Sequence, residues 1–151
     1  MKAVWFEGEF WCNAREATRA RGIFYALAAG NHGADACNSS PARVGTSNGV
    51  MTVTATDKED KETSWSNYGS GVDIWAPGAS ILPTRKGGSS TAMSGTSMAS
   101  PHGAGGGALY LSTNTSASAA AVESTLRSNA QGTRTVSKDG RAISREYVAS
   151  F

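Results

Sequence analysis

Residues 94–102 read SGTSMASPH, and this stretch decides how the rest of the chain is interpreted. A glycine-containing loop gives way at Ser97 to small apolar residues whose spacing predicts a helix to about Leu111. Pro101 is tolerated because it falls in the first turn of that helix. A serine in a first helical turn lies beside free N–H groups and the positive end of the helix dipole, which suits a nucleophile that generates an oxyanion. An ordinary N-capping serine fits the same residues, which do not separate the two interpretations.

Strand-like and helix-like segments alternate around this stretch. The apolar run 22–31, GIFYALAAGN, is bounded by glycines and predicts a strand buried on both faces. The other expected strands are 50–56 (VMTVTAT), 72–75 (VDIW) and 79–82 (ASIL). The other expected helices are 117–128 and 13–21, the latter with Asn13 and Glu16 at capping-box spacing. Residues after 128 read as a polar tail, and the alternation as a whole predicts an α/β fold.

Composition limits the kinds of partner. The chain has 151 residues, with 14 basic and 12 acidic side chains and a formal net charge of +2. Because the basic residues form no stripe, nucleic acid is not an expected partner. No apolar run reaches the roughly 20 residues of a membrane span, and the start MKAVWFEGEFWC lacks the features of a signal peptide. No linker divides the chain, so we expect a leader at 1–12 and one domain at 13–151.

Several short blocks carry a resemblance to a known family: AAGN at 28–31, SNYG at 66–69, VDIWAPG at 72–78 and GTSMASPH at 95–102. They resemble the subtilases, and specifically their proteinase-K-like branch, over roughly residues 13–128. The resemblance implies the C-terminal portion of the subtilisin-like fold, a mostly parallel sheet flanked by helices. It also implies a secreted serine endopeptidase, which hydrolyses peptide bonds through an acyl-enzyme and takes polypeptides as substrates.

The resemblance assigns roles to individual residues. It makes Ser97 the nucleophile and Asn31, 66 positions upstream, the side-chain donor of the oxyanion hole. The backbone N–H of Ser97 is the second donor. Ala28, Ala29 and Gly30 match the strand edge that lines the pocket for the substrate side chain before the scissile bond. Small residues at a strand end are as often mere packing, so their assignment stays open between a substrate pocket and the core.

A structural calcium ion is also implied by the resemblance, whereas the chemistry itself needs no cofactor. In the proteinase-K-like branch the aspartate that matches Asp73 binds calcium together with backbone carbonyls, here near Asn48 and Val50. One carboxylate and two carbonyls make a partial shell that water has to complete, because calcium takes about six to eight oxygens. A solvated or turn-bonded Asp73 is the alternative.

The histidine and aspartate that complete the family's triad are expected upstream of the serine, in HGTH-type and D-T/S-G-type segments, and residues 1–30 resemble neither. His102 follows Ser97 by five helical residues, which turns it about 140° around the axis and away from the serine. His32 has no carboxylate placed to orient it. We therefore expect the chain alone to be nearly inactive, with its own N-terminal half as a partner. A non-catalytic remnant that binds peptides is the alternative function.

Departures from the family pattern involve packing. In some relatives the cysteine that matches Cys37 forms a disulfide with a residue just before the Val-Asp pair, but here that position is Gly71. Cys37 is therefore expected to be unpaired unless Cys12 reaches it. The expected serine helix has Gly103 and Gly106 where the family has apolar residues, and each helical glycine costs about 0.8–1.0 kcal/mol relative to alanine.

Overall fold

The computed structural model describes residues 22–84, 87–88 and 90–151. The expected leader at 1–12, the expected helix at 13–21 and Cys12 lie outside the described residues. Within these residues a five-stranded sheet has the order β1-β2-β3-β5-β4. Its strands are β1 (Tyr25–Ala28), β2 (Val50–Thr56), β3 (Ile74–Pro77), β4 (Gln131–Val136) and β5 (Ala142–Arg145). All neighbouring pairs are parallel except β4 with β5, which confirms the expected α/β fold with a mostly parallel sheet.

β2 lies between β1 and β3 in the sheet, and every one of its residues is buried. Its apolar side chains, Met51, Val53 and Ala55, belong to the core on one face of the sheet. The threonines between them point to the other face, because side chains alternate along a strand. Burial on both faces explains why β-branched residues dominate this strand.

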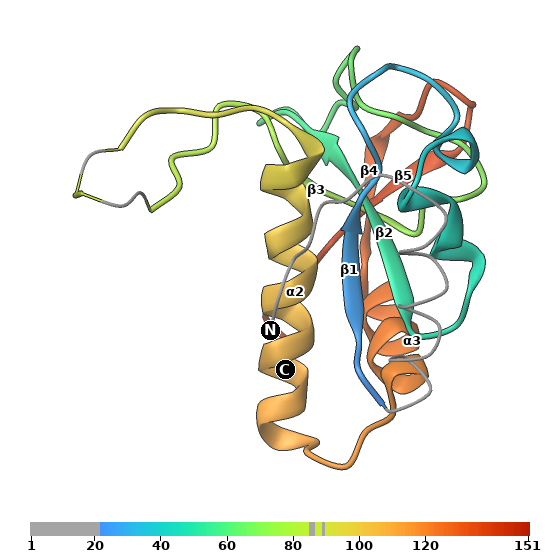
Figure 1. Cartoon of the computed structure of the whole chain (residues 1–151), viewed down its shortest axis with the longest axis vertical. Helices are drawn as coiled ribbons and strands as arrows, with labels where there is room; N and C mark the ends of the chain where they lie inside the picture. The colour runs from blue at the N-terminus through green and yellow to red at the C-terminus, as the bar shows by residue number, and fades with distance from the viewer. Residues whose placement is uncertain (1–21, 85–86, 89) are drawn as a thin grey trace.

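The helices α2 (Thr96–Thr113) and α3 (Ala119–Asn129) lie where the sequence predicts them. α2 packs on β1, β2 and β3 and also contacts α3, as Figure 1 shows. The core between these helices and the sheet contains, among others, Phe24, Met51, Val53, Ile74, Ala99, Val122 and Leu126. Neither helix, in the part of the chain that the structure describes, is long and apolar enough to cross a membrane.

Among the described residues, short 3-10 turns cover the opposite face of the sheet. They are η1 (Ala36–Asn38) and η2 (Ala42–Thr46), both in the loop from β1 to β2. The second core cluster comprises Ala29, Ala36, Ala42, Val72, Trp75 and Ile143. The hydroxyl of Thr52 donates to the carbonyl of Ala42 at 3.0 Å, so a buried polar group of β2 is satisfied on this face.

Two sequence-based expectations about strands are wrong. Residues 79–82 do not form a strand: Ile81 only makes an isolated bridge with Met93, and Ser80 has a φ of 55°, which interrupts extended backbone. The segment after 128 is not a tail but the β4–β5 hairpin. Its strands were hidden because most of β4 is exposed and polar, so that the alternation of apolar residues is weak at this sheet edge.

The glycines of α2 allow the helix to lie close to its neighbours. A Cβ at Gly103 would lie 3.0 Å from Val53 Cγ2, and a Cβ at Gly107 would lie 2.8 Å from two ring atoms of Phe24. A Cβ at Gly106 would collide with the carboxylate of Glu146. Glycine is a poor helix former, but at these positions it lets the helix pack closely, and a larger side chain would prevent this packing.

Candidate active site

Ser97 lies in the first turn of α2, where backbone N–H groups lack intrahelical acceptors. The N–H of Thr96 donates to Asn31 Oδ1 at 2.9 Å, and the N–H of Met98 donates to the carbonyl of Gly95 at 2.9 Å. Among the residues that the structure describes, the N–H of Ser97 has no acceptor. Ser97 itself is partly exposed. A reachable hydroxyl thus lies beside a free donor, as the attack on a carbonyl requires.

Asn31 lies beside the start of this helix and is exposed. Its Oδ1 accepts hydrogen bonds from both the N–H and the hydroxyl of Thr96, each at 2.9 Å. The hydroxyl of Thr96 in turn accepts from the N–H of Gly30 at 3.1 Å. Because its oxygen is occupied in this way, the amide of Asn31 has one orientation, with its NH₂ group as the remaining donor. A Cβ on Gly95 would lie 3.5 Å from that nitrogen, so the donor lies over the loop that precedes Ser97.

Asn67 holds the backbone that carries Asn31. Its Oδ1 accepts from the N–H groups of His32 at 2.9 Å and Ala34 at 3.1 Å. Its Nδ2 donates to the carbonyl of Ala29 at 2.9 Å. Asn67 and Thr96 lie in the blocks SNYG and GTSMASPH, but the residue pattern alone indicates no role for them. Their contacts join segments far apart in the chain, which spacing alone does not reveal.

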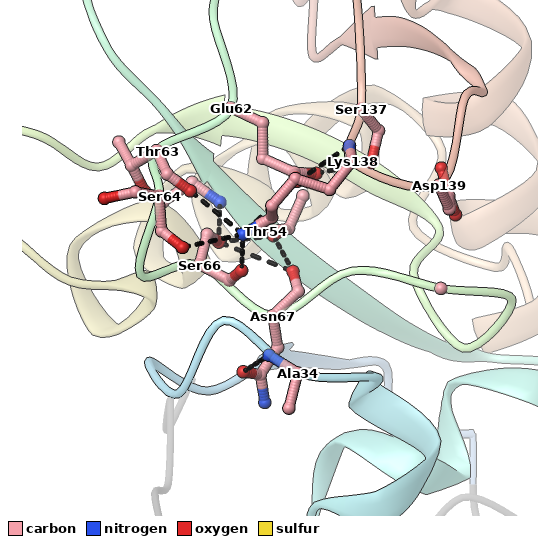
Figure 2. Close-up of polar contacts among 12 residues, drawn as sticks. Ala34, Thr54, Glu62, Thr63, Ser64, Ser66, Asn67, Ser137, Lys138 and Asp139 are labelled. Carbon is pink, nitrogen blue, oxygen red and sulfur yellow. Dashed lines mark hydrogen bonds and ion pairs between the residues drawn. The ribbon is translucent and has the colours of Figure 1, made fainter.

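Lys138 anchors the segment that contains Asn67, as Figure 2 shows. Its ammonium, on the β4–β5 hairpin, donates to the backbone carbonyls of Thr63, Ser64 and Ser66. It also lies 3.6 Å from Glu62 Oε1, and the Glu62 side chain is almost fully buried. The β4–β5 hairpin, which the sequence pattern does not predict, therefore supports the loop that carries Asn31 through its contacts with the segment of Asn67.

The residues expected to line a substrate pocket do surround a cavity. Ala28, Ala29, Gly30 and Asn31 line it together with residues 38–41, and its volume is about 370 Å³. Ala28 and Gly30 are partly exposed, whereas Ala29 is fully buried in the second core cluster. Both readings of this strand end therefore have support: its backbone borders the cavity, and one of its side chains belongs to the core.

No hydrogen bond joins either histidine to Ser97 among the residues that the structure describes. His32 is exposed, and its backbone N–H is the group that Asn67 binds. His102 lies on α2 with its Nδ1 3.0 Å from the carbonyl of Met98, one turn earlier on the same helix. Within the described part of the chain, neither ring forms an ion pair with a carboxylate.

Asp73, the residue expected to bind calcium, is held by protein groups. Its Oδ2 accepts from the N–H of Thr52 at 2.7 Å, and its Oδ1 lies 3.1 Å from Arg127 Nη1. Burial raises the pKa of Asp73 to about 7, although the hydrogen bond from Thr52 and the positive charge of Arg127 lower it. No group of three or more His, Cys, Asp or Glu side chains suited to a metal ion occurs among the described residues. Asn48 lines a neighbouring cavity with Arg127, while Val50 is buried in β2.

Cys37 has a free thiol that lies against Gly71. A Cβ built on Gly71 would be 3.0 Å from Cys37 Sγ. The thiol also lies 3.6 Å from the hydroxyl of Ser70. The structure thus brings together the two positions that the resemblance pairs in some relatives, with glycine at one of them.

Comparison with known proteins gives consistent matches. The family model described as "Subtilase family" matches residues 3–148. The chain is 50% identical to alkaline serine exoprotease A of Vibrio alginolyticus over 109 residues, which are 72% of this chain and 20% of that protein. It is 55% identical to proteinase R of Parengyodontium album over 84 residues, which are 56% of this chain and 21% of that protein.

Solved structures match over nearly the whole chain. A cold adapted subtilisin-like serine proteinase superposes with a TM-score of 0.87 at 37% identity, covering 95% of this chain and 52% of that one. A protease of Pseudoalteromonas arctica superposes with a TM-score of 0.78 at 31% identity, covering 93% of this chain and 45% of that one. The chain therefore spans about a fifth of the length of the curated relatives above and about half of the solved structures.

Proposed function

This chain belongs to the subtilase family, and on that premise we propose that the protein is a serine endopeptidase that cleaves polypeptides. The hydroxyl of Ser97 attacks the carbonyl carbon of the scissile peptide bond and forms an acyl-enzyme, which water then hydrolyses. The oxyanion of each tetrahedral intermediate accepts hydrogen bonds from the Ser97 N–H and from the side-chain NH₂ of Asn31. Ala28 and Gly30 border the subsite for the side chain before the scissile bond.

One observation carries this proposal: the double hydrogen bond from Thr96 to Asn31 Oδ1. An asparagine held by its oxygen presents its NH₂ group in a preorganised direction, so no reorganisation is needed when the oxyanion forms. The arrangement would have little purpose around a serine that only caps a helix, because such a cap accepts a hydrogen bond and needs no donor beside it.

We further propose that the base is a histidine of another polypeptide segment, with an aspartate that orients it. His32 and His102 are the only histidines of the chain, and neither forms a hydrogen bond with Ser97 in the described residues. Without a base the serine hydroxyl is a weak nucleophile, so the chain alone is expected to be nearly inactive. An N-terminal half of the catalytic domain is the natural source, since the solved relatives extend over about twice the matched length.

The setting proposed for this activity follows the family. Polypeptides are the expected substrates and secretion the expected destination, with no role for nucleic acid or a membrane. The alternative function is a non-catalytic remnant that binds peptides along the cavity beside Asn31. It differs from the peptidase in one chemical property, the reactivity of Ser97.

Covalent labelling with a fluorophosphonate distinguishes these functions, because the probe reacts only with an activated serine. We expect the naturally expressed protein to be labelled at Ser97, as identified by peptide mass spectrometry, and Ser97→Ala to abolish labelling. In subtilisin, itself a member of this family, loss of the asparagine donor lowers kcat by about 10²–10³. Asn31→Ala is therefore expected to slow peptide hydrolysis by a similar factor. Thr96→Val, which removes only one of the two bonds to Asn31, is expected to have a smaller effect.

A naturally expressed protein that folds and binds peptides but is not labelled at Ser97 would favour the non-catalytic remnant and contradict the peptidase, whereas absence of labelling in the isolated chain is expected under both. Labelling that persists in Asn31→Ala at the wild-type rate would contradict the role given to that side chain. Ser112, which is exposed elsewhere on α2, provides a matched control, since Ser112→Ala should leave labelling unchanged.

A further inference from the structure

Arg127 lies where the family resemblance places a calcium ion, at the junction of three parts of the fold. Asp73 immediately precedes β3, Thr52 belongs to β2, and Glu123 and Arg127 lie one turn apart on α3. Asp73 and Glu123 are both nearly buried, with side chains 6% and 9% exposed, whereas the side chain of Arg127 is 52% exposed. Two carboxylates are thus withdrawn from water and one cation reaches them from the surface.

A single nitrogen of the guanidinium contacts both carboxylates. Arg127 Nη1 lies 3.1 Å from Asp73 Oδ1 and 3.2 Å from Glu123 Oε1. Two buried negative charges repel each other and are costly to desolvate, and a shared cation offsets both effects. A divalent metal ion often performs this function between carboxylates, and here a side chain does so.

The other oxygen of each carboxylate is also occupied. Asp73 Oδ2 accepts from the N–H of Thr52 at 2.7 Å, and Glu123 Oε2 accepts from the N–H of Gly49 at 2.5 Å. Each carboxylate therefore has one oxygen bound to a backbone N–H, that of Thr52 in β2 or of Gly49 just before it, and one oxygen bound to Arg127. A calcium ion needs about six to eight oxygens at about 2.3–2.6 Å, and it would meet the half-exposed guanidinium of Arg127 beside this pair. The residues present do not fit the ion.

We propose that the guanidinium of Arg127 takes the place of a bound cation, joining α3 to β2 and to the start of β3, so that this junction needs no calcium. The inference concerns stability and does not depend on the proposed peptidase activity. It has a direct consequence: Arg127 and Glu123 line a cavity of about 440 Å³ together with Asn48, and when Arg127 is removed, Glu123 and the neighbouring Asp73 lose their shared cation and become a site for a divalent cation.

The test measures the thermal unfolding midpoint of the full chain in EDTA and in excess CaCl₂. Wild type is expected to melt at the same temperature in both. Arg127→Ser is expected to melt about 5–15 °C lower in EDTA, since it leaves a buried acidic pair uncompensated. Calcium is expected to restore part of that loss, because an ion that binds only the folded state raises its stability.

Two further variants separate the cation from other effects of the substitution. Arg127→Lys keeps a positive charge and is expected to remain insensitive to calcium, while the double variant Arg127→Ser/Glu123→Gln is expected to lose the calcium response. Arg134→Ser, at an exposed position on β4, controls for loss of net charge and should behave as wild type. Calcium stabilisation of wild type that Asp73→Asn abolishes would overturn the proposal, and so would an Arg127→Ser variant that calcium leaves unchanged.

Discussion

Gly71→Cys is expected to close a disulfide with Cys37. In a bridge whose S–S bond is about 2.04 Å long, the Cβ of one half-cystine lies about 3 Å from the sulfur of the other. The Cβ position of Gly71 lies 3.0 Å from Cys37 Sγ, and its next neighbours are backbone atoms at 3.6 and 3.9 Å. The φ of Gly71 lies outside the left-handed region, so a cysteine is not strained there.

The size of the effect follows from the loop that the bridge would close. Positions 37 and 71 are 34 residues apart, and closing a loop of that length removes about 3–4 kcal/mol of chain entropy from the unfolded state. For a chain of this size such a gain raises the unfolding midpoint by about 6–15 °C.

The assay compares two variants in a Cys12→Ser background, so that only Cys37 and the new thiol can react. The Gly71→Cys protein, after mild oxidation, should contain no titratable thiol and should melt higher than its own form reduced with dithiothreitol. Gly71→Ser is the matched control and should not respond to the reductant. Thiols that stay free in the folded, oxidised sample would refute the geometric reasoning, and a bridge that forms without raising the midpoint would refute the magnitude.

Two further expectations concern the contacts of α2. Burial raises the pKa of Glu146 from 4.5 to about 7, and its carboxylate oxygens have no hydrogen-bond partner in the described residues. The folded state therefore holds the proton more tightly than the unfolded state, so up to about 3 kcal/mol of stability is lost as the pH rises from about 4.5 to 7; denaturant unfolding across this range should show the loss. Glu146→Gln should reduce the loss and leave the part that Asp73 contributes, since burial also raises the pKa of Asp73 to about 7. Gly107→Ala should lower the unfolding free energy by about 1 kcal/mol, because overpacking against Phe24 outweighs the gain in helix propensity. Gly105→Ala, on the same helix with nothing within 4 Å of the new Cβ, should instead raise it by about 0.8–1.0 kcal/mol; equal shifts in the two variants would contradict this account.

The local patterns of the sequence predict much of the fold. The β-branched run at 50–56 and the small-residue helix that begins near Ser97 are correct to within two residues, because β-branched side chains fit a strand buried on both faces and the small residues recur at helical spacing. The β4–β5 hairpin is not predicted from the sequence in this way. Its residues lie at a sheet edge with few buried side chains, and its pairing is determined by the neighbouring strand rather than by its own composition.

The candidate site divides in the same way. The family resemblance assigns an oxyanion donor to residue 31 and a nucleophile to residue 97, and these roles stay predictions, because the residue types alone do not separate a nucleophilic serine from a helix cap. What holds them is decided only in three dimensions. The carboxyl ends of parallel strands meet at one edge of the sheet. There Thr96 donates hydrogen bonds to Asn31, and Asn67 binds the loop that begins at His32.

The same limit applies to Glu123 on α3 and Asp73 just before β3. The sequence places Asp73 in an expected strand at 72–75, and the family resemblance implies a cation beside it. Only the tertiary structure decided which cation is there, because Arg127 reaches Asp73 across 54 positions of sequence once α3 packs on the sheet. Local spacing encodes helices and strands, whereas the partner of a buried charge depends on how those elements pack.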